Sequence, residues 1–301
     1  MNFIDFQKQF STEKDIINHF IKIRYGSEQA ACNHCGSLKV HQRPTRLRIF
    51  QCNDCHNDFS IFKGTIFEQS TTPLVKWFYT IHLFLNAKKG VSGLQLQREL
   101  GVTYKTAWRM LKQIRLAMNV DDLKNTFDNV VEIDETYVGG KPRKGGDAKR
   151  HYGAYDKWSK KTPVVGVKDR EKKMVYAKVT LPEAGAKGLK AKQLLNVLKE
   201  STKEGSTVMT DEAGGYYLVS LNNYRHHTIN HSKGYVRDKG YIHTNGIESF
   251  WSTLKRGLYG IYHSVSVKYL QLYVNEFCFR YNNRTNPEIF NQLLIKSIMT
   301  I

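Results

Sequence analysis

The sequence Val-Val-Glu-Ile-Asp-Glu-Thr-Tyr-Val occupies residues 130–138 and sets acidic side chains among β-branched and apolar ones. Its composition predicts a β-strand. Asp134 stands inside this strand, and a carboxylate there is costly to bury unless a cation or hydrogen bonds compensate its charge. The stretch Thr207-Val-Met-Thr-Asp211 repeats the pattern, because a short predicted strand ends on a second aspartate. Both aspartates are therefore candidates for a site that holds a cation.

Predicted strands and helices follow one another on the carboxyl side of Asp134. Further strands are predicted at 163–167, 173–180 and 207–210, and helices at 187–199, 245–256 and 266–282. This order indicates a mixed α/β (α+β) domain. The run 139–161 holds eight Lys or Arg with several glycines, so it predicts a long basic loop.

A third acidic residue, Glu248, lies on the predicted helix 245–256. Lys255 follows seven residues later on the same face, since seven residues are close to two helical turns. Two aspartates on strands and one acid on a helix are a ligand set that suits a pair of Mg²⁺ ions in phosphoryl transfer. The spacing alone leaves an alternative open, in which Glu248 is a solvated helix acid and Asp211 a turn residue.

Upstream, residues 73–118 have the pattern of three helices. The predicted helices are 73–87, 92–100 and 104–118, and the break Gly101-Val-Thr103 between the last two predicts a helix-turn-helix capped by Thr103. The apolar set expected to pack inside is Leu94, Leu100, Val102, Ala107, Met110, Leu111 and Ile114. The face expected to contact DNA bases and phosphates carries Tyr104, Lys105, Arg109, Lys112 and Arg115. An ordinary helical hairpin with a solvated charged face is the alternative.

Four cysteines form two pairs, Cys32-Asn-His-Cys35 and Cys52-Asn-Asp-Cys55, with sixteen residues between them. Two such tight turns can present four sulfurs to one ion, so the spacing predicts a tetrahedral zinc site. Because all four ligands are cysteines, no position is left for water, and the zinc is expected to be structural.

The composition is globular but strongly basic. The 301 residues include 46 Lys or Arg and 27 Asp or Glu, which leaves a formal charge of +19. A surplus of this size favours a polyanionic partner such as nucleic acid. The longest apolar run, 77–85, is far shorter than the roughly 20 residues that a membrane span needs, so no membrane partner is expected. The first ten residues lack the pattern of a secretory signal, and an intracellular location is expected.

Three segments resemble the DDE-type transposases of small bacterial insertion sequences related to the eukaryotic Merlin elements. They are the run from Val131 to Lys141, the segment Thr210-Asp-Glu-Ala and the motif His-Thr-Asn-Gly-Ile-Glu-Ser-Phe-Trp-Ser-Thr-Leu-Lys-Arg-Gly-Leu-Tyr-Gly-Ile-Tyr-His at 243–263. Members of this family combine a zinc ribbon, a helical DNA-binding region and an RNase H-like catalytic domain. The resemblance covers nearly the whole chain. With it, the ribbon is expected at 26–65, the helix-turn-helix at 72–120 and the catalytic domain at 128–301, and the helical spacing of apolar residues predicts a further N-terminal helical segment at 1–25.

The resemblance also implies the roles of the site residues. Asp134 and Asp211 would be the first two metal-binding acids and Glu248 the third, together holding two Mg²⁺ or Mn²⁺ ions. Lys255 would contact DNA beside them. Related families vary the third acid to Asn or His, so Asn245 and His243 are candidates as well, although neutral ligands suit hard cations less well than a carboxylate does.

Basic residues beside these acids outline a path for DNA. Phosphate contacts are expected from the basic loop and from the helix that carries Glu248, at Lys141, Arg143, Lys144, Lys255 and Arg256. For the loop, the alternative is a disordered, solvated segment, and both interpretations hold if the loop becomes ordered on DNA.

The sequence thus predicts a DNA transposase that binds the terminal inverted repeats of its element and catalyses metal-dependent strand cleavage and transfer. Its partners would be double-stranded DNA, both element ends and target, and a second copy of the chain or more on that DNA. Its location would be the bacterial cytoplasm, at the nucleoid, or the nucleus in a eukaryote. Two alternatives remain at this stage: a non-catalytic DNA-binding regulator, and an RNase H-like nuclease without strand transfer.

Overall fold

The computed structural model describes residues 1–139, 161–184, 186, 188–211, 214–229, 238 and 241–298. The chain divides into two compact units. One comprises Met1–Met118 with Thr285–Ile301, and the other comprises Asn119–Arg284.

The first unit begins with two helices and a small ribbon. Its elements here are α1 (Phe3–Gln9), α2 (Glu13–Tyr25), β1 (Val40–Arg43), β2 (Arg46–Cys52) and β3 (Asp58–Ser60), and the strands form an antiparallel sheet in the order β1-β2-β3. Helix α2 starts at a reciprocal capping box, in which the Thr12 side chain accepts from the Asp15 N–H and Asp15 accepts from the Thr12 N–H. The ribbon is the one that the cysteine spacing predicts.

Three helices follow the ribbon in the same unit: α3 (Leu74–Asn86), α4 (Gly93–Leu100) and α5 (Tyr104–Ala117). Gly101 closes α4 in the left-handed conformation (φ 60°), and the Thr103 side chain caps α5 by accepting from the Thr106 N–H. Both elements therefore lie where the sequence predicts them. One core assignment was wrong, because Leu94 is 57% exposed whereas Leu96 is fully buried.

The end of the chain belongs to the first unit. Helix α10 (Ile289–Ile298) buries Phe290 beside Phe10 and Phe78, with ring centroids 5.5 and 5.7 Å apart. The Ile66 N–H also donates to the Ser297 carbonyl at 3.3 Å. The unit that contains the large sheet thus ends at Arg284, whereas the sequence placed residues 128–301 in one domain. Apolar packing of α10 on distant aromatic rings accounts for the difference.

The second unit is built on a mixed sheet. Its strands among the described residues are β4 (Val130–Val138), β5 (Thr162–Asp169), β6 (Met174–Val179), β7 (Thr207–Asp211) and β8 (Arg225–Ile229), in the spatial order β6-β5-β4-β7-β8. Strands β6, β5 and β4 pair antiparallel, while β7 is parallel to both β4 and β8. This mixed arrangement of strands and helices agrees with the α/β (α+β) class that the sequence predicts.

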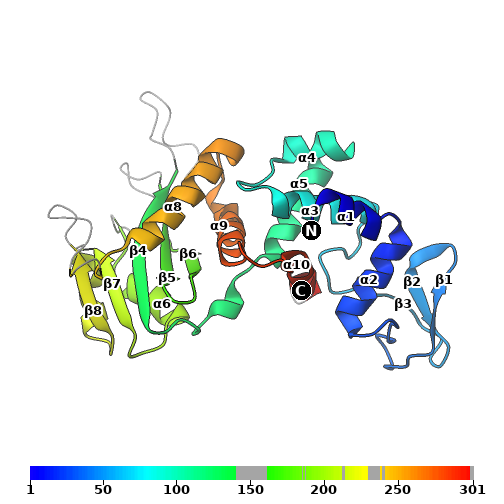
Figure 1. Cartoon of the computed structure of the whole chain (residues 1–301), viewed down its shortest axis with the longest axis horizontal. Helices are drawn as coiled ribbons and strands as arrows, with labels where there is room; N and C mark the ends of the chain where they lie inside the picture. Colours follow the sequence, from blue (N-terminus) through cyan, green and yellow to red (C-terminus); the bar gives the residue numbers. More distant parts are fainter. Residues whose placement is uncertain are drawn as a thin grey trace. The chain divides into compact units, whose positions relative to one another are not determined.

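Helices cover both faces of this sheet (Figure 1). They are α6 (Ala191–Ser201), α7 (Tyr217–Ser220), α8 (Asn245–Gly257) and α9 (Val267–Asn282), with short 3₁₀ turns η1 (Asp121–Leu123) and η2 (Gly214–Tyr216) and a π-helical turn η3 (Leu258–Tyr262) after α8. Side chains alternate between the two faces of a strand. Glu132 and Asp134 of β4 accordingly meet α8, whereas Glu135 meets Tyr216 of η2.

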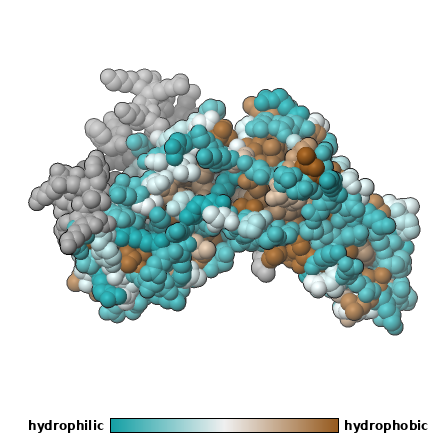
Figure 2. All heavy atoms as spheres, in the orientation of Figure 1, coloured by the Kyte–Doolittle hydropathy of each residue, from teal (hydrophilic) through white to brown (hydrophobic). Residues whose placement is uncertain are grey.

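In the described part of the chain, no helix has both the length and the apolar character of a membrane span. Hydrophilic residues cover most of the face seen in Figure 2.

Candidate active site

The structure places Asp134 and Asp211 on neighbouring strands. Strands β4 and β7 run parallel, with Glu132 paired to Met209. Asp134 and Asp211 each follow two residues later on their strand, so they stand at the same level of the sheet. The two strands thus bring together acids that are 77 residues apart in the sequence.

A tryptophan from α8 holds one oxygen of Asp134. The Trp251 Nε1–H donates to Asp134 Oδ2 at 3.0 Å. Gly166 of β5 pairs with Asp134 in the sheet and makes room for the indole, because a Cβ at Gly166 would lie 2.5 Å from Trp251 Cη2. A glycine in a strand interior often marks such a close approach. Gly166 therefore lets α8 pack closely enough for Trp251 to fix the Asp134 carboxylate.

Negative charge accumulates around Asp134. Burial, together with the charges of Glu135 and Asp211, raises the pKa of Asp134 to about 7 from its ordinary 3.8. Burial also raises the pKa of Glu135, and Asp211 adds to that rise against the lowering effect of a 2.5 Å hydrogen bond from the Tyr216 hydroxyl. A divalent cation would relieve this repulsion, and hard carboxylate oxygens are the donors that Mg²⁺ or Mn²⁺ takes. The residues present therefore fit such an ion.

Glu248 lies in the first turn of α8, where the helix dipole favours a negative charge. Its Oε1 accepts from Thr244 Oγ1 at 2.8 Å. Among the described residues, only the four cysteines gather three or more His, Cys, Asp or Glu ligand atoms within 4.8 Å of one another. The structure therefore brings Asp134 and Asp211 to adjacent strands, but Glu248 does not join them in a cluster of ligand atoms within 4.8 Å of one another. Asn245 is the first residue of the same helix and is exposed.

His243 precedes α8 and is held by Arg170. Arg170 Nη2 lies 3.1 Å from His243 Nδ1, and arginine can only donate, so Nδ1 accepts. The neutral ring then carries its proton on Nε2 and offers no lone pair to a metal. Burial and the charge of Arg170 lower the pKa of His243, which agrees with a neutral ring. This geometry argues for a supporting role of His243.

Lys255 and Arg256 occupy the last turn of α8, two turns beyond Glu248. Lys255 is half-buried, while Arg256 is exposed and its Nε donates to the Ser252 carbonyl at 3.1 Å. The other basic candidates expected to contact phosphates, Lys141, Arg143 and Lys144, lie outside the described residues.

The four cysteines come together in the ribbon. Cys32 Sγ lies 3.6 Å from Cys55 Sγ, and Cys35 Sγ lies 3.6 Å from Cys52 Sγ. Tetrahedral zinc with sulfurs at about 2.3 Å requires sulfur separations of about 3.8 Å, so the cluster fits one structural zinc ion. The two cysteine pairs lie on two separate turns of the same type. The N–H of Gly36 donates to the Cys32 carbonyl in one turn, and the N–H of His56 donates to the Cys52 carbonyl in the other.

Helix α5 exposes part of the surface that the sequence assigns to DNA. Tyr104 and Lys105 are exposed, and Arg109 and Lys112 are half-buried. The assignment of Arg115 to this face was wrong, because Arg115 is only 2% exposed. Its guanidinium carbon lies 5.3 Å from the centroid of the Phe84 ring. The physical reason is the helical period, which turns position 115 toward α3.

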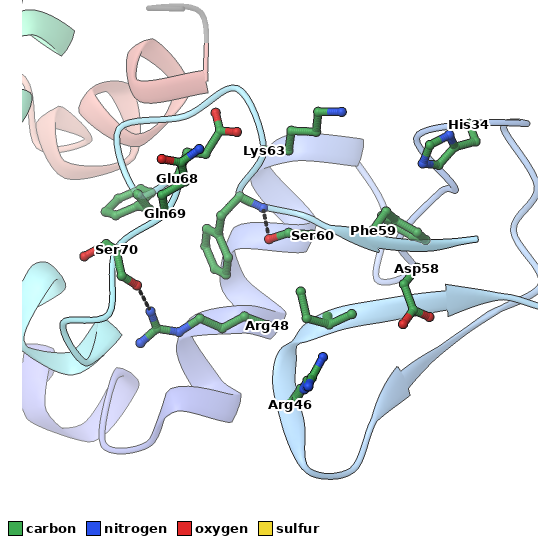
Figure 3. A pocket seen from close by; sticks show the side chains of 13 residues that line it. His34, Arg46, Arg48, Asp58, Phe59, Ser60, Lys63, Glu68, Gln69 and Ser70 are labelled. Carbon is green, nitrogen blue, oxygen red and sulfur yellow. Dashed lines mark hydrogen bonds between the residues drawn. The ribbon is translucent and has the colours of Figure 1, made fainter. Parts of the chain in front are cut away.

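A groove of about 450 Å³ lies in the first unit between the ribbon and residues 62–70 (Figure 3). Two of its charged lining residues, Arg48 and Asp58, have partners of opposite charge within the protein. Arg48 donates to Glu13 and to the Ser70 carbonyl, both at 2.7 Å, and Asp58 forms an ion pair with Arg43 at 3.0 Å. The Arg48 bonds tie the ribbon to α2 and to Ser70, and the Arg43–Asp58 pair links β1 to β3 within the ribbon, so we assign the groove no chemistry.

Sequence reasoning missed the residues that support the acids. They are Gly166, Trp251, Tyr216, Glu132 and Arg170, which contact one another or the acids across 32 to 117 positions of the sequence. The one available signal was Gly166, a glycine inside the predicted strand 163–167.

Comparison with known proteins gives these sites a family context. Residues 126–282 match the ISXO2-like transposase domain, and residues 11–58 match the transposase zinc-ribbon domain. A Halobacterium salinarum protein, named as an uncharacterized protein in transposable element ISH50, is 28% identical over 266 residues, which cover 83% of this chain and 85% of that protein. An uncharacterized transposase-like protein of Haemophilus influenzae is 31% identical over 109 residues, which cover 35% of this chain and 86% of that protein.

Solved structures of the Mos1 transposase are also similar to the chain. The strand transfer complex is 13% identical, with a TM-score of 0.31, and the match covers 77% of each chain. The pre-cleavage transpososome is 12% identical, with a TM-score of 0.29, and the match covers 75% of this chain and 80% of that chain.

Proposed function

Because this chain belongs to the family of the ISXO2-like transposase domain, we propose that it binds the terminal inverted repeats of its own insertion sequence and catalyses metal-dependent strand cleavage and strand transfer. The observation that carries the proposal is the placement of Asp134 and Asp211 at one level of two parallel strands. Burial and mutual repulsion there favour a divalent cation.

Asp134, Asp211 and Glu248 are proposed to hold two Mg²⁺ or Mn²⁺ ions. When bound, such ions supply activation of the attacking oxygen and stabilisation of the leaving oxygen in phosphoryl transfer. The protein's own residues orient the ligands. Trp251 fixes Oδ2 of Asp134 and thereby sets the direction of its other oxygen. Thr244 holds Glu248 in the first turn of α8.

DNA binding is proposed for one tyrosine and three basic residues of α5, for two basic residues of α8 and for three basic residues of the run 139–161. Tyr104, Lys105, Arg109 and Lys112 of α5 are assigned to the element ends, where base contacts specify the sequence and phosphate contacts position the protein. Lys255 and Arg256 of α8 are assigned to the phosphates near the reacting bond, together with Lys141, Arg143 and Lys144. A dimer or larger assembly on DNA is proposed, because strand transfer joins two element ends to one target.

The central test substitutes the first acid. Asp134→Ala is expected to leave binding of element ends unchanged in a gel-shift assay and to abolish both cleavage and strand transfer in Mg²⁺ or Mn²⁺. Retained strand transfer would contradict the assignment. Glu248→Gln and Asn245→Ala, tested side by side, identify the third ligand, and the proposal expects the larger loss from Glu248→Gln.

The same assay separates the alternatives. A DNA-binding regulator would bind element ends without any metal-dependent nicking. A nuclease without strand transfer would nick DNA but yield no joined product. The proposed transposase yields both nicked and joined DNA.

A further inference from the structure

Glu132 is a fully buried carboxylate on β4, two residues before Asp134. Its two oxygens take different donors. Oε1 accepts from Arg170 Nε at 2.7 Å, and Oε2 accepts from the Ile247 backbone N–H at 2.8 Å. One end of this carboxylate is thus bonded to the loop after β5 and the other to the first turn of α8.

Arg170 extends the connection to the segment that leads into α8. Its Nη1 donates to the Tyr241 carbonyl at 2.7 Å and its Nη2 to the His243 carbonyl at 2.6 Å. The guanidinium thereby fixes the backbone immediately before Asn245. Its planar fork allows these bonds to form simultaneously, which a lysine ammonium cannot reproduce with the same geometry.

Gly246 allows the close approach of the helix to Glu132. A Cβ at this position would lie 2.7 Å from Glu132 Oε2 and 3.0 Å from Oε1, and it would also collide with Lys168 Nζ. The start of α8 is therefore seated directly on the buried carboxylate. Glycine at this position has a steric reason that is independent of helix propensity.

We propose that Glu132 and Arg170 are positioning residues that hold the start of α8, and with it Asn245 and Glu248, at a fixed place relative to Asp134. The inference rests on the proposed function, because it assigns to α8 a ligand of the metal site. Neither residue touches the reacting atoms. Both act by fixing the position of α8 relative to β4.

The substitution Glu132→Gln separates this role from simple filling of space. Gln has almost the same shape, but its amide has one acceptor oxygen where the carboxylate has two. Two donors, Arg170 Nε and the Ile247 N–H, face these atoms, so one of them must meet an NH₂ group. Arg170→Lys keeps the positive charge but removes the planar guanidinium and its several donors. It tests the same role if the Glu132→Gln variant does not fold.

Glu276→Gln is the matched control. Glu276 is also fully buried, and its Oε1 accepts from Arg280 Nε at 3.1 Å and from the Tyr262 hydroxyl at 2.8 Å. It lies on α9 rather than beside the acids. Glu276→Gln removes a buried negative charge that pairs with Arg280, so it is expected to lower stability without changing the contact between β4 and α8.

The experiment measures Mn²⁺ binding to the full-length, zinc-loaded protein without DNA, by the loss of the free-ion electron paramagnetic resonance signal. Asp134→Ala defines the binding that belongs to the proposed site. Glu132→Gln and Arg170→Lys are expected to raise the Kd of that binding by about 10-fold or more, the usual effect of removing a partner that orients metal ligands. Glu276→Gln is expected to stay within about twofold of the parent protein, on the same scale.

The outcomes distinguish the two proposals. If Asp134→Ala removes Mn²⁺ binding while Glu132→Gln and Arg170→Lys bind as the parent protein does, the positioning role is overturned and the metal site stands. An equal loss in Glu276→Gln also overturns the positioning role, because general destabilisation then explains the effect. If Asp134→Ala leaves Mn²⁺ binding unchanged, the metal site itself fails and the positioning role fails with it.

Discussion

Gly166→Ala offers a direct test of how the sheet and α8 fix Asp134. The added Cβ would lie 2.5 Å from Trp251 Cη2, 2.7 Å from Cζ2 and 3.1 Å from Ile247 Cδ1. Carbon atoms pack at about 3.5 Å or more, so the indole must move by about 1 Å. A movement of this size is enough to lose the 3.0 Å hydrogen bond from Trp251 Nε1 to Asp134 Oδ2.

Two destabilising effects and one stabilising effect determine the magnitude. Overpacking costs about 1 to 3 kcal/mol, and losing a hydrogen bond to a charged group costs about 1.5 to 3 kcal/mol. Replacing a strand glycine by alanine returns about 0.5 to 1 kcal/mol. The net expectation is a loss of about 2 to 5 kcal/mol in the free energy of unfolding.

Urea unfolding followed by circular dichroism measures this loss, with separate transitions fitted for the two compact units. Gly260→Ala is the matched control, because a Cβ there would meet nothing within 4 Å. In a Trp251→Phe background the smaller ring leaves room for the methyl group, so Gly166→Ala is expected to cost at least about 1 kcal/mol less than in the parent protein. A loss below about 0.5 kcal/mol, or the same loss in both backgrounds, would refute the packing argument.

Three further predictions concern charge, DNA and zinc. The pKa of Asp134 is about 7 in the folded protein and near 3.8 when unfolded, so its contribution to stability falls as the pH rises from about 4 to about 7. Without divalent cations, Asp134→Asn should leave the free energy of unfolding unchanged at pH 4 and raise it by at most about 4 kcal/mol over the parent protein at pH 8, as measured by urea unfolding. A gain in stability that is independent of pH would contradict the shifted pKa. Lys105→Ala should weaken binding of element ends and reduce the magnitude of the slope of log affinity against log salt concentration by about 1. Arg115→Ala should instead lower the melting temperature and leave that slope unchanged. The reverse pattern would indicate that Arg115 contacts DNA. Cys52→Ser should lose the single zinc ion in metal analysis and leave the ribbon unfolded, and a zinc-free ribbon that stays protected in hydrogen exchange would argue against a structural metal.

Local sequence signals were sufficient for the first unit's small motifs. The spacing of the cysteines defines two identical turns, and Gly101 and Thr103 mark the end of α4 and the start of α5. These signals lie within a few residues of the structure they specify. The sequence also identified both strand aspartates, because an acid inside an apolar strand is unusual at any single position.

Tertiary packing decided which surfaces those motifs present. Arg115 carries a charge and lies on a helix whose other basic residues are partly or fully exposed, yet its guanidinium lies over Phe84 of α3. Likewise, α10 joins the first unit because Phe290 finds the rings of Phe10 and Phe78 there. Periodicity predicts an apolar face, but it does not say which distant face will cover it.

What the sequence by itself determined is the set of chemical groups: the zinc-binding cysteines, the basic helix and the acids on the strands. Only the tertiary structure determined how the acids are held. Glu132 bonds Arg170 and Ile247, and Trp251 crosses Gly166 to reach Asp134, over separations of 38 to 117 residues. Such contacts depend on how a helix packs on a sheet. The role of a buried carboxylate or a strand glycine can therefore be assigned only when the residue that packs against it is known.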